Sequence, residues 1–425
     1  MEAQLEIRDA LERARASTQQ LLEPIADDEL VAQASVLTSP IVWEYAHVAA
    51  FEELWLLRSL NGTPSVSERH REVEEALRHE HDHPALPPLR PAAVRAYAED
   101  VRTSVLGALE HLDLDAPNAL LRHRFVFGLV IQNELQHQEA MLQTVQLRTG
   151  TEYPVPKPTT PDTAPGGPVE IHVPAGSFVL GAVYEPWAYD NELESHEIEL
   201  RSFWIDRVPV TNRDFAEFVD DRGYHAKRVW SPEGWDWRER KGVSLPLYWE
   251  EDDEWQRVRF GRREPLPPDE PVQHVSWYEA DAFARWAGKR LPTEIEWERA
   301  AGWHDHEGKF RYPWGQEWMG FEASLDRLRF SPAPVGSYAG GVSPVGCVQM
   351  SGDVWEWTSS RFQSYPGFLA FPGPECSEIY FGDAYRVLRG GSWATAALVA
   401  RTTFRNWDYP YRRQLFAGFR CARDA

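Results

Sequence analysis

The sequence predicts an α+β chain of two domains, a four-helix bundle followed by a domain that is poor in regular structure. The 425 residues are too many for one ordinary core and suggest two or three domains of roughly 150 residues each. Residues 1–150 are almost free of glycine, and their apolar residues recur three and four apart, which is typical of helices packed through one face. Beyond residue 168 the chain changes to short β-like runs with many Trp and Gly residues.

Four helices are expected in the first domain, and four such helices predict a bundle. The first covers about residues 3–22. The second begins at Ser39-Pro40, an N-cap followed by a proline at the first helical position, and ends at Asn61-Gly62. After a His- and Pro-rich crossover at 79–91, the third helix covers 92–112 and the fourth runs from about 118 to 147.

A proline-rich linker is expected at residues 151–168, between a first domain at 1–150 and a second at 169–425. Residues 153–168 alone hold six prolines and two glycines, which prevents both a helix and a central strand. In the second domain, strands are expected within 169–180 and 202–210, and helices at 212–221 and 277–288. The remainder is expected to be irregular, with 223–271 an ordered loop whose aromatic residues need a surface to pack on.

Composition restricts the class of protein. The formal net charge is −22, which disfavours general binding to nucleic acid. The three cysteines lack C-x-x-C spacing, so neither a disulfide framework nor a zinc ribbon is expected. No segment has the 18 or so apolar residues that a membrane span requires, and the first residues lack the apolar core of a signal peptide. A cytoplasmic protein without a membrane partner is therefore expected.

The second domain carries an ordered set of motifs. They are SWYEADAFARWAGKRLPTEIEWERAA at 276–301, MSGDVWEWTSS at 350–360, YRVLRGGSW at 385–393 and GFRCA at 418–422. This set resembles the catalytic domain of the formylglycine-generating enzymes, which implies a C-type-lectin-like fold. Those enzymes carry a cysteine pair shortly after the RGGSW segment, whereas residues 394–408 contain no cysteine. Thiolate-ligated copper chemistry is therefore not expected.

The whole chain resembles the ergothioneine-biosynthesis sulfoxide synthases of the actinobacterial type. The resemblance rests on SPIVWEYAHVAAFEELWLLR at 39–58, NELQHQEAMLQTVQLRTG at 133–150 and RNWDYPYRRQ at 405–414. It implies that the bundle is DinB-like and supplies ligands to a mononuclear non-heme Fe(II), and that the second domain completes the pocket. It also implies a reaction in which dioxygen is used to join a thiol, γ-glutamylcysteine or cysteine, to the imidazole of the betaine hercynine.

The resemblance implies three metal ligands. His47 matches the first ligand of the family, and His137 matches the last ligand of an H-E-x-Q-H motif. Here that motif begins with Asn133, so an amide stands where the family has its second histidine. The i, i+4 spacing puts Asn133 and His137 on one face of a helix, one turn apart. An amide oxygen is a harder and weaker donor than imidazole, so a lower iron affinity is expected.

The resemblance also implies residues that bind the substrates. Gln136, Asn406 and Trp407 match the contacts to the trimethylammonium group of hercynine, for which amide oxygens and an indole face are suitable. Asp408 and Arg412 match the residues that hold the ammonium and carboxylate groups of the thiol substrate.

Two further segments depart from the family. His83 falls where the family uses an additional arginine on the glutamyl carboxylate. Gly373 and Cys376 stand in the segment where a catalytic tyrosine is expected, with Tyr380 nearby. No catalytic residue is assigned from the sequence.

Simpler interpretations remain open beside these. His47 alone would fit a hydrogen-bonded core histidine, and Asp408 with Arg412 would fit a structural salt bridge. The departures leave two alternatives to the family reaction: a divergent paralogue without catalytic iron chemistry, and an oxygenase that acts on a different betaine or thiol.

Overall fold

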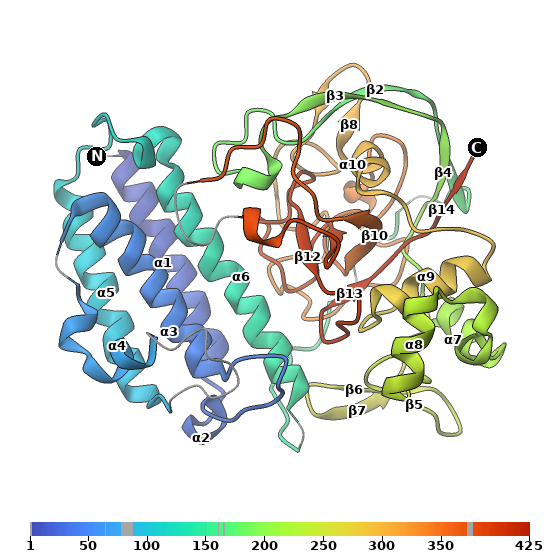
Figure 1. Cartoon of the computed structure of the whole chain (residues 1–425), viewed down its shortest axis with the longest axis horizontal. Helices are drawn as coiled ribbons and strands as arrows, with labels where there is room; N and C mark the ends of the chain where they lie inside the picture. Colours follow the sequence, from blue (N-terminus) through green and yellow to red (C-terminus); the bar gives the residue numbers. More distant parts are fainter. Residues whose placement is uncertain are drawn as a thin grey trace. The chain divides into compact units, whose positions relative to one another are not determined.

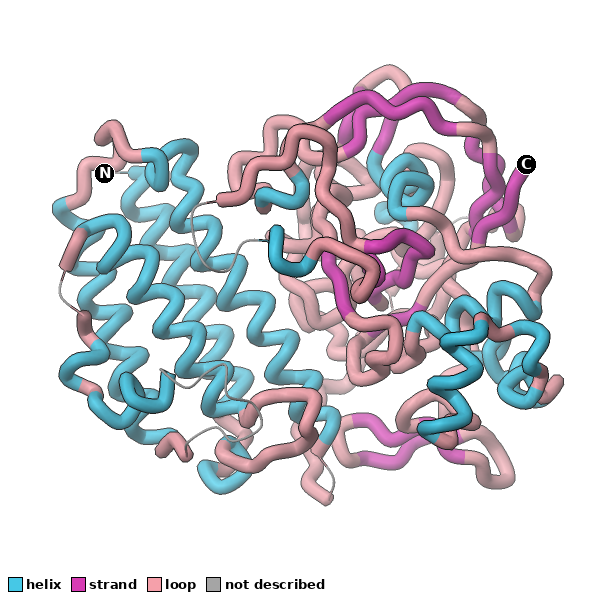
Figure 2. The backbone as a smooth tube through the Cα atoms, in the orientation of Figure 1, coloured by secondary structure: helices cyan, strands magenta, loops and turns pink. Residues whose placement is uncertain are grey.

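The computed structural model describes the whole chain except residues 1, 64, 78–87, 149, 160, 165 and 372–376. The chain divides into two compact units, Met1–Pro154 and Val155–Ala425. Helices make up most of the first unit, whereas short strands and loops dominate the second (Figure 2). This agrees with the expected α+β class.

Four long helices form the first unit (Figure 1). They are α1 (Glu2–Leu22), α3 (Ile41–Glu52), α5 (Pro91–His111) and α6 (Phe125–Leu147). Helix α1 packs against α5 and α6, and α3 packs against the same two helices, so each helix has two neighbours in a bundle. On α1 the buried residues Ile7, Leu11, Ala14 and Leu21 recur three, four and seven apart, which is the one-face pattern that the sequence predicted.

Shorter helical segments complete this unit. They are α2 (Asp27–Leu30), η1 (Glu53–Ser59), η2 (Ser67–Arg69), α4 (Arg71–Leu77) and η3 (Ala119–Arg124). The segment η1 is a π-helix that directly extends α3. The fourth long helix begins later than the predicted residue 118, because His123 and Arg124 adopt left-handed backbone angles that interrupt the helix before Phe125.

A buried ion-pair network joins all four long helices, with one charged residue from each. Arg15 of α1 contacts Glu134 of α6 and Glu52 of α3, each at 2.8 Å. Arg102 of α5 contacts the same two carboxylates at 3.1 and 2.6 Å. All four side chains are less than 10% exposed. We call these four residues the central network; each guanidinium meets both carboxylates, which is the arrangement that makes buried charge tolerable.

The second unit contains five small sheets. The first two have the strand orders β1-β4-β14 and β12-β11-β10-β13, and the others are β2-β3, β5-β6-β7 and β8-β9. The strands of the first two are β1 (Glu170–Val173), β4 (Phe203–Asp206), β14 (Ala422–Asp424), β10 (Trp355–Arg361), β11 (Arg386–Arg389), β12 (Asn406–Asp408) and β13 (Ala417–Gly418). The other strands are β2 (Gly176–Leu180), β3 (His196–Leu200), β5 (Trp249–Glu250), β6 (Gln256–Arg259), β7 (Arg262–Pro265), β8 (Trp303–His304) and β9 (Gly308–Lys309).

The prediction of a loop at 223–271 is wrong. This stretch contains helix α8 (Pro232–Lys241) and the β5-β6-β7 sheet, together with the short segments η5 (Gly223–His225) and η6 (Lys227–Val229). Helix α8 begins at an N-cap, where the Ser231 hydroxyl accepts a hydrogen bond from the Gly234 amide, and it ends at Gly242 in the left-handed conformation. Both cap signals are in the sequence, but the helix is too short for a clear periodicity.

The other helices of this unit are α7 (Asn212–Asp220), α9 (Trp277–Trp286) and α10 (Glu294–Gly302), with η4 (Asp190–Glu192), η7 (Ala339–Gly341) and η8 (Ser377–Tyr380). Helices α7 and α9 lie where the sequence predicted them, whereas α10 was not predicted. It begins with a capping box, in which Thr293 and Glu296 bond each other's backbone amides.

Buried tryptophans lie in the core of this loop-rich unit. Trp355, Trp357 and Trp393 are all buried. The indole N–H of Trp357 donates to the Val275 carbonyl at 3.0 Å, so this large side chain is buried without losing a hydrogen bond. The first glycine of the RGGSW segment, Gly390, has no room for a side chain. A Cβ there would lie 2.6 Å from the Met350 carbonyl oxygen.

The proline-rich segment packs along the second unit. Thr163 bridges to Ser337, the Ala164 amide donates to the Gly336 carbonyl at 2.6 Å, and the Tyr338 amide donates to the Asp162 carbonyl at 2.9 Å. Its described residues form no helix, in agreement with their proline content. None of the helices in the described part of the chain combines the length and the apolar content that a bilayer crossing requires.

Removal of one carboxylate from the central network should destabilise the first unit. In Glu52→Gln, Arg15 and Arg102 remain buried with one carboxylate between them, and we expect a loss of about 3–5 kcal/mol in the free energy of unfolding. Glu110→Gln is the matched control, because Glu110 is 57% exposed and pairs only at the surface with Arg8, so its loss should be below about 1 kcal/mol. Urea denaturation followed by circular dichroism measures both; equal losses would contradict the structural role of the network.

Candidate metal centre and substrate-binding residues

Helices α3 and α6 bring the two predicted histidine ligands together. The ring centres of His47 on α3 and His137 on α6 lie 4.7 Å apart, with their planes at 45°. Two imidazoles bound to adjacent positions of one metal ion at about 2.1 Å would have ring centres roughly 4.5 Å apart. The observed separation therefore fits two ligands of a single ion. Both rings are half-buried, so the pair is not enclosed in dry packing.

Asn133 lies one helical turn before His137 on α6. Its side-chain oxygen is buried and has no hydrogen-bond partner among the described residues. A buried acceptor without a partner is costly, and such groups in folded proteins commonly indicate a bound water or ion. The residues present therefore fit a metal ion held by two imidazoles and one amide oxygen.

One residue of this centre was missed by the sequence analysis. Glu44 of α3 contacts His137 across the bundle, with Oε2 at 2.7 Å from Nδ1. It lies three residues before His47 and therefore on the same side of α3. A carboxylate at this spacing inside VWEYAH was a usable signal, because histidine ligands commonly hydrogen-bond a carboxylate through their second nitrogen.

Few His, Cys, Asp or Glu side chains surround the candidate metal centre. Across the residues that the structure describes, no three His, Cys, Asp or Glu side chains are grouped to hold a metal ion. A metal at His47 and His137 would therefore depend on Asn133, on Gln136 beside it, or on water and substrate for its remaining ligands. The Gln136 amide N–H₂ donates to the Gln132 carbonyl at 3.1 Å.

In the second unit, the predicted substrate residues lie on the edge strand β12 and directly after it. Trp407 stacks on Phe362, with ring centres 4.2 Å apart and planes at 10°, and Tyr380 lies 5.3 Å from the same indole. The Asn406 side-chain oxygen accepts the backbone N–H of Trp407 at 2.8 Å. Asn406 and Trp407 are both half-buried, as residues that contact a small ligand would be.

Asp408 and Arg412 form a loose pair, with Oδ1 and Nε 3.5 Å apart and side chains 20% and 19% exposed. Burial raises the pKa of the Asp408 carboxyl to about 6, and the Arg412 charge only partly offsets this. The Tyr409 amide donates to Asp408 at 2.6 Å. The structure thus brings the two predicted thiol-binding residues together, and the same contact is what a structural salt bridge would show.

Three tyrosines lie near strand β12 and contact one another. The Tyr385 hydroxyl donates to the Tyr409 hydroxyl at 3.0 Å, and their ring centres lie 4.5 Å apart. Tyr380 lies 5.8 Å from Tyr385 between ring centres. Gly373 and Cys376, which the sequence analysis placed in the tyrosine segment, lie outside the described residues.

His83 also lies outside the described residues. Of the other cysteines, Cys347 and Cys421 are free and buried. Burial raises the pKa of the Cys347 thiol to about 11, which makes it a poor nucleophile or ligand at neutral pH.

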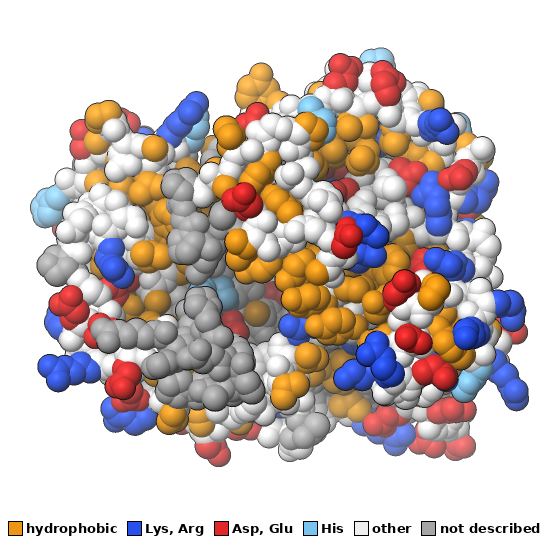
Figure 3. All heavy atoms as spheres, viewed as in Figure 1, with side chains coloured by type: hydrophobic (Ala, Val, Ile, Leu, Met, Phe, Trp, Pro, Cys, Tyr) orange, Lys and Arg blue, Asp and Glu red, His pale blue; other side chains and the backbone are white. Residues whose placement is uncertain are grey.

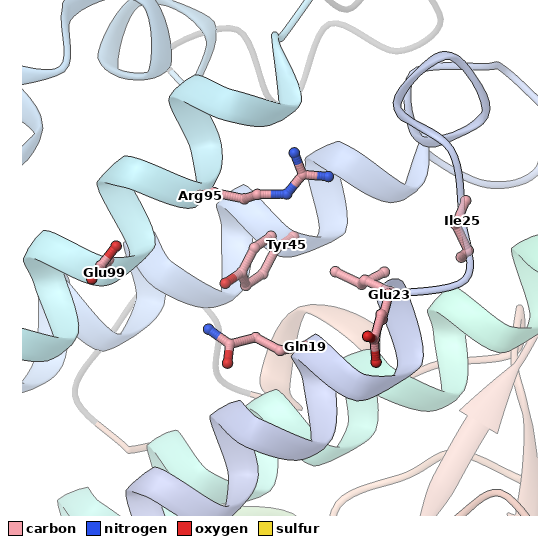
Figure 4. Close-up of a pocket in the computed structure, with 7 residues that line it drawn as sticks. Gln19, Glu23, Ile25, Tyr45, Arg95 and Glu99 are labelled. Carbon is pink, nitrogen blue, oxygen red and sulfur yellow. The ribbon is translucent and has the colours of Figure 1, made fainter.

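A cavity of about 320 Å³ lies elsewhere in the first unit. It is lined by residues of α1, α3 and α5 and of the turn after α1, namely Gln19, Leu22, Glu23, Ile25, Tyr45, Arg95 and Glu99 (Figure 4). Tyr45 and His47 are two residues apart on α3 and therefore point to opposite sides of that helix. The cavity is thus separate from the histidine pair. Figure 3 shows apolar side chains gathered over the middle of the visible face of the second unit, with charged side chains mostly around them.

Comparisons with known proteins cover both units. Residues 156–425 match the sulfatase-modifying factor enzyme 1-like domain, and residues 10–141 match the DinB superfamily. The chain is 45% identical to a hercynine oxygenase of Mycobacterium tuberculosis over 97% of each chain. It is 44% identical to a hercynine oxygenase of Mycolicibacterium smegmatis over 98% of each chain. A formylglycine-generating enzyme of Streptomyces coelicolor is 34% identical over 60% of this chain and 89% of its own.

A metal-binding titration tests the centre. Purified protein should bind one Co(II) or Fe(II) ion per chain under anaerobic conditions, and His47→Ala and His137→Ala should each weaken binding by more than 100-fold, beyond the ~10–100-fold that losing an outer hydrogen bond costs. Asn133→His should tighten binding by on the order of tenfold, or roughly 1.4 kcal/mol, because imidazole replaces a weaker donor. Unchanged binding in both alanine variants would rule out the histidine pair as ligands.

Proposed function

Since the chain belongs to the hercynine oxygenase family, we propose that it is an oxidoreductase that uses dioxygen and ferrous iron to join a thiol to C2 of the hercynine imidazole. Two observations support the proposal: the chain is 45% identical to a hercynine oxygenase over 97% of both chains, and the ring centres of the two matched histidines lie 4.7 Å apart. Hercynine, a thiol such as γ-glutamylcysteine or cysteine, and dioxygen would be the substrates.

In this proposal, His47, His137 and Asn133 hold the iron. Ferrous iron bound there would supply the redox chemistry with dioxygen and lower the pKa of a coordinated thiol. The protein's contribution is a donor set without a negative charge, two imidazoles and one amide, with open positions for the thiol and dioxygen. The buried, unpartnered oxygen of Asn133 supports its assignment as the third ligand.

Each charged group of the substrates is assigned to protein residues of suitable chemistry. The trimethylammonium group of hercynine cannot donate ordinary hydrogen bonds, so the amides of Gln136 and Asn406 and the indole of Trp407 would stabilise it through their oxygens and π face. Phe362 covers one face of that indole and holds it in place. Asp408 would accept the ammonium group of the thiol substrate, and Arg412 would bind its carboxylate through two parallel hydrogen bonds. A role for His83 in binding the thiol substrate remains a proposal from the sequence.

Product formation tests the proposal directly. Protein purified without oxygen and supplied with ferrous iron, hercynine and either γ-glutamylcysteine or cysteine should consume oxygen when air is admitted. The expected product has the mass of hercynine plus the thiol plus one oxygen atom minus two hydrogen atoms, because the two hydrogens and the second oxygen atom of dioxygen leave as water. Omission of hercynine is the matched control for iron-catalysed thiol oxidation. Absence of any coupled mass with either thiol would overturn the thiol-joining reaction.

A second candidate is a paralogue whose metal site no longer supports this reaction, or one that acts on another betaine or thiol. The observation that favours it is Asn133, which places a weaker donor where the family has histidine. Asn133→His separates the cases. If it creates coupling activity that the natural chain lacks, the natural protein is the paralogue; if neither form acts on hercynine yet both bind iron, a panel of betaines and thiols identifies the substrate.

The thiol substrate should bind more weakly at acidic pH. Asp408 binds an ammonium group only as a carboxylate, and its raised pKa of about 6 means that the protonated, neutral form dominates below that pH. The groups that face Asp408 are Arg412, Tyr385 and Tyr411, and burial raises the pKa values of the two tyrosines, which therefore stay neutral. We therefore expect kcat/KM for the thiol to fall about tenfold per pH unit below an inflection near pH 6. The Asp408→Asn substitution should remove this inflection and change the affinity for hercynine by no more than about threefold. An inflection that persists in the variant would contradict the role of Asp408.

A further inference from the structure

Helix α3 directs two side chains at a single imidazole of α6. His47 and Glu44 are three residues apart on α3 and both reach His137, the first ring to ring at 4.7 Å and the second through a 2.7 Å contact to Nδ1. The Glu44 and His137 side chains are only 16% and 23% exposed. This contact is therefore partly shielded from water, which makes it stronger than a surface pair.

The contact determines which nitrogen of His137 is available. An ionised carboxylate can only accept a hydrogen bond, so Nδ1 must carry the proton. Nε2 is then left with its lone pair, which is the form of imidazole that binds a metal ion. A carboxylate bonded to the far nitrogen also makes the imidazole a stronger donor and fixes the orientation of its ring.

We propose that Glu44 is the positioning residue of the metal centre: it holds His137 as the Nε2-donating tautomer and strengthens that ligand. The inference rests on the proposed function, because it requires that a metal binds at His47 and His137. Glu44 itself does not contact the metal in this proposal and acts only through His137.

Because Asn133 stands in place of a third histidine, the contact between Glu44 and His137 should matter more for metal affinity. An amide oxygen contributes less to metal affinity than an imidazole does, so more of the affinity must come from the two histidines. Strengthening of His137 by Glu44 offsets part of that deficit. The effect of losing Glu44 should accordingly be larger in the natural chain than in an Asn133→His background.

A purely structural role for Glu44 would give different results. If the contact served only to join α3 to α6, its removal would lower the stability of the metal-free protein and leave the metal's ligand environment unchanged. The visible absorption of bound Co(II) reports on that environment without any enzymatic turnover, so it distinguishes a positioning residue from a structural link.

The experiment is an anaerobic Co(II) and Fe(II) titration of the full chain and five variants, with the melting temperature of each metal-free form. Glu44→Gln should weaken both metals about 10–100-fold and shift the Co(II) absorption bands, and Glu44→Asp should recover part of the affinity. Glu99→Gln, which removes an exposed carboxylate of α5 in the same unit, is the charge-matched control and should bind as the natural chain does. In a His137→Ala background, Glu44→Gln should have no further effect on affinity.

The outcomes separate this inference from the proposed function. If the natural chain binds metal but Glu44→Gln binds it equally well with an unshifted Co(II) spectrum, the positioning role is overturned while the proposed function stands. An equal loss in the Glu99→Gln control, or a further loss in the His137→Ala background, would also overturn it. Failure of the natural chain to bind either metal would overturn both proposals.

Discussion

The first unit depends on the central network, in which Arg15, Glu52, Arg102 and Glu134 satisfy one another inside the bundle. Buried charges of this kind are tolerated only when every partner is in place, so they restrict the rotation of each helix about its own axis. Because Glu52 lies on α3 and Glu134 on α6, the network also determines which faces of these helices meet. The convergence of the two histidines therefore follows from the same constraint that stabilises the bundle.

The parts of the fold that the sequence predicted well are those with a long periodic signal. The four long helices bury one face over many turns, and this produces a repeat that can be seen without a structure. Helices α8 and α10 have about ten residues each and lie in segments rich in Trp and charge, so their evidence is confined to their caps at Ser231 and Thr293. The three strands of the β5-β6-β7 sheet are shorter still and leave almost no alternation to detect.

In the candidate site, too, some residues could be predicted from the sequence and others could not. His47, Asn133 and His137 could be matched to a motif because two of them share one helix turn and the third stands in a recognisable segment. Glu44 stands three residues before His47, which was a usable signal, but its partner His137 is 93 residues away and the pairing appears only once α3 faces α6. The central network escaped prediction for the same reason, since Arg15 and Glu134 are 119 residues apart. Sequence spacing predicts neighbours on one helix, whereas contacts between helices depend on the packing of all four.

The unpartnered oxygen of Asn133 has an evolutionary consequence. Codons for asparagine and histidine differ at a single base, so one base change converts this chain into one with a third imidazole. No hydrogen bond to that oxygen from the described residues would be broken by the change to histidine. Natural selection could therefore adjust the strength of the metal centre in one step, without rebuilding the helices that surround it.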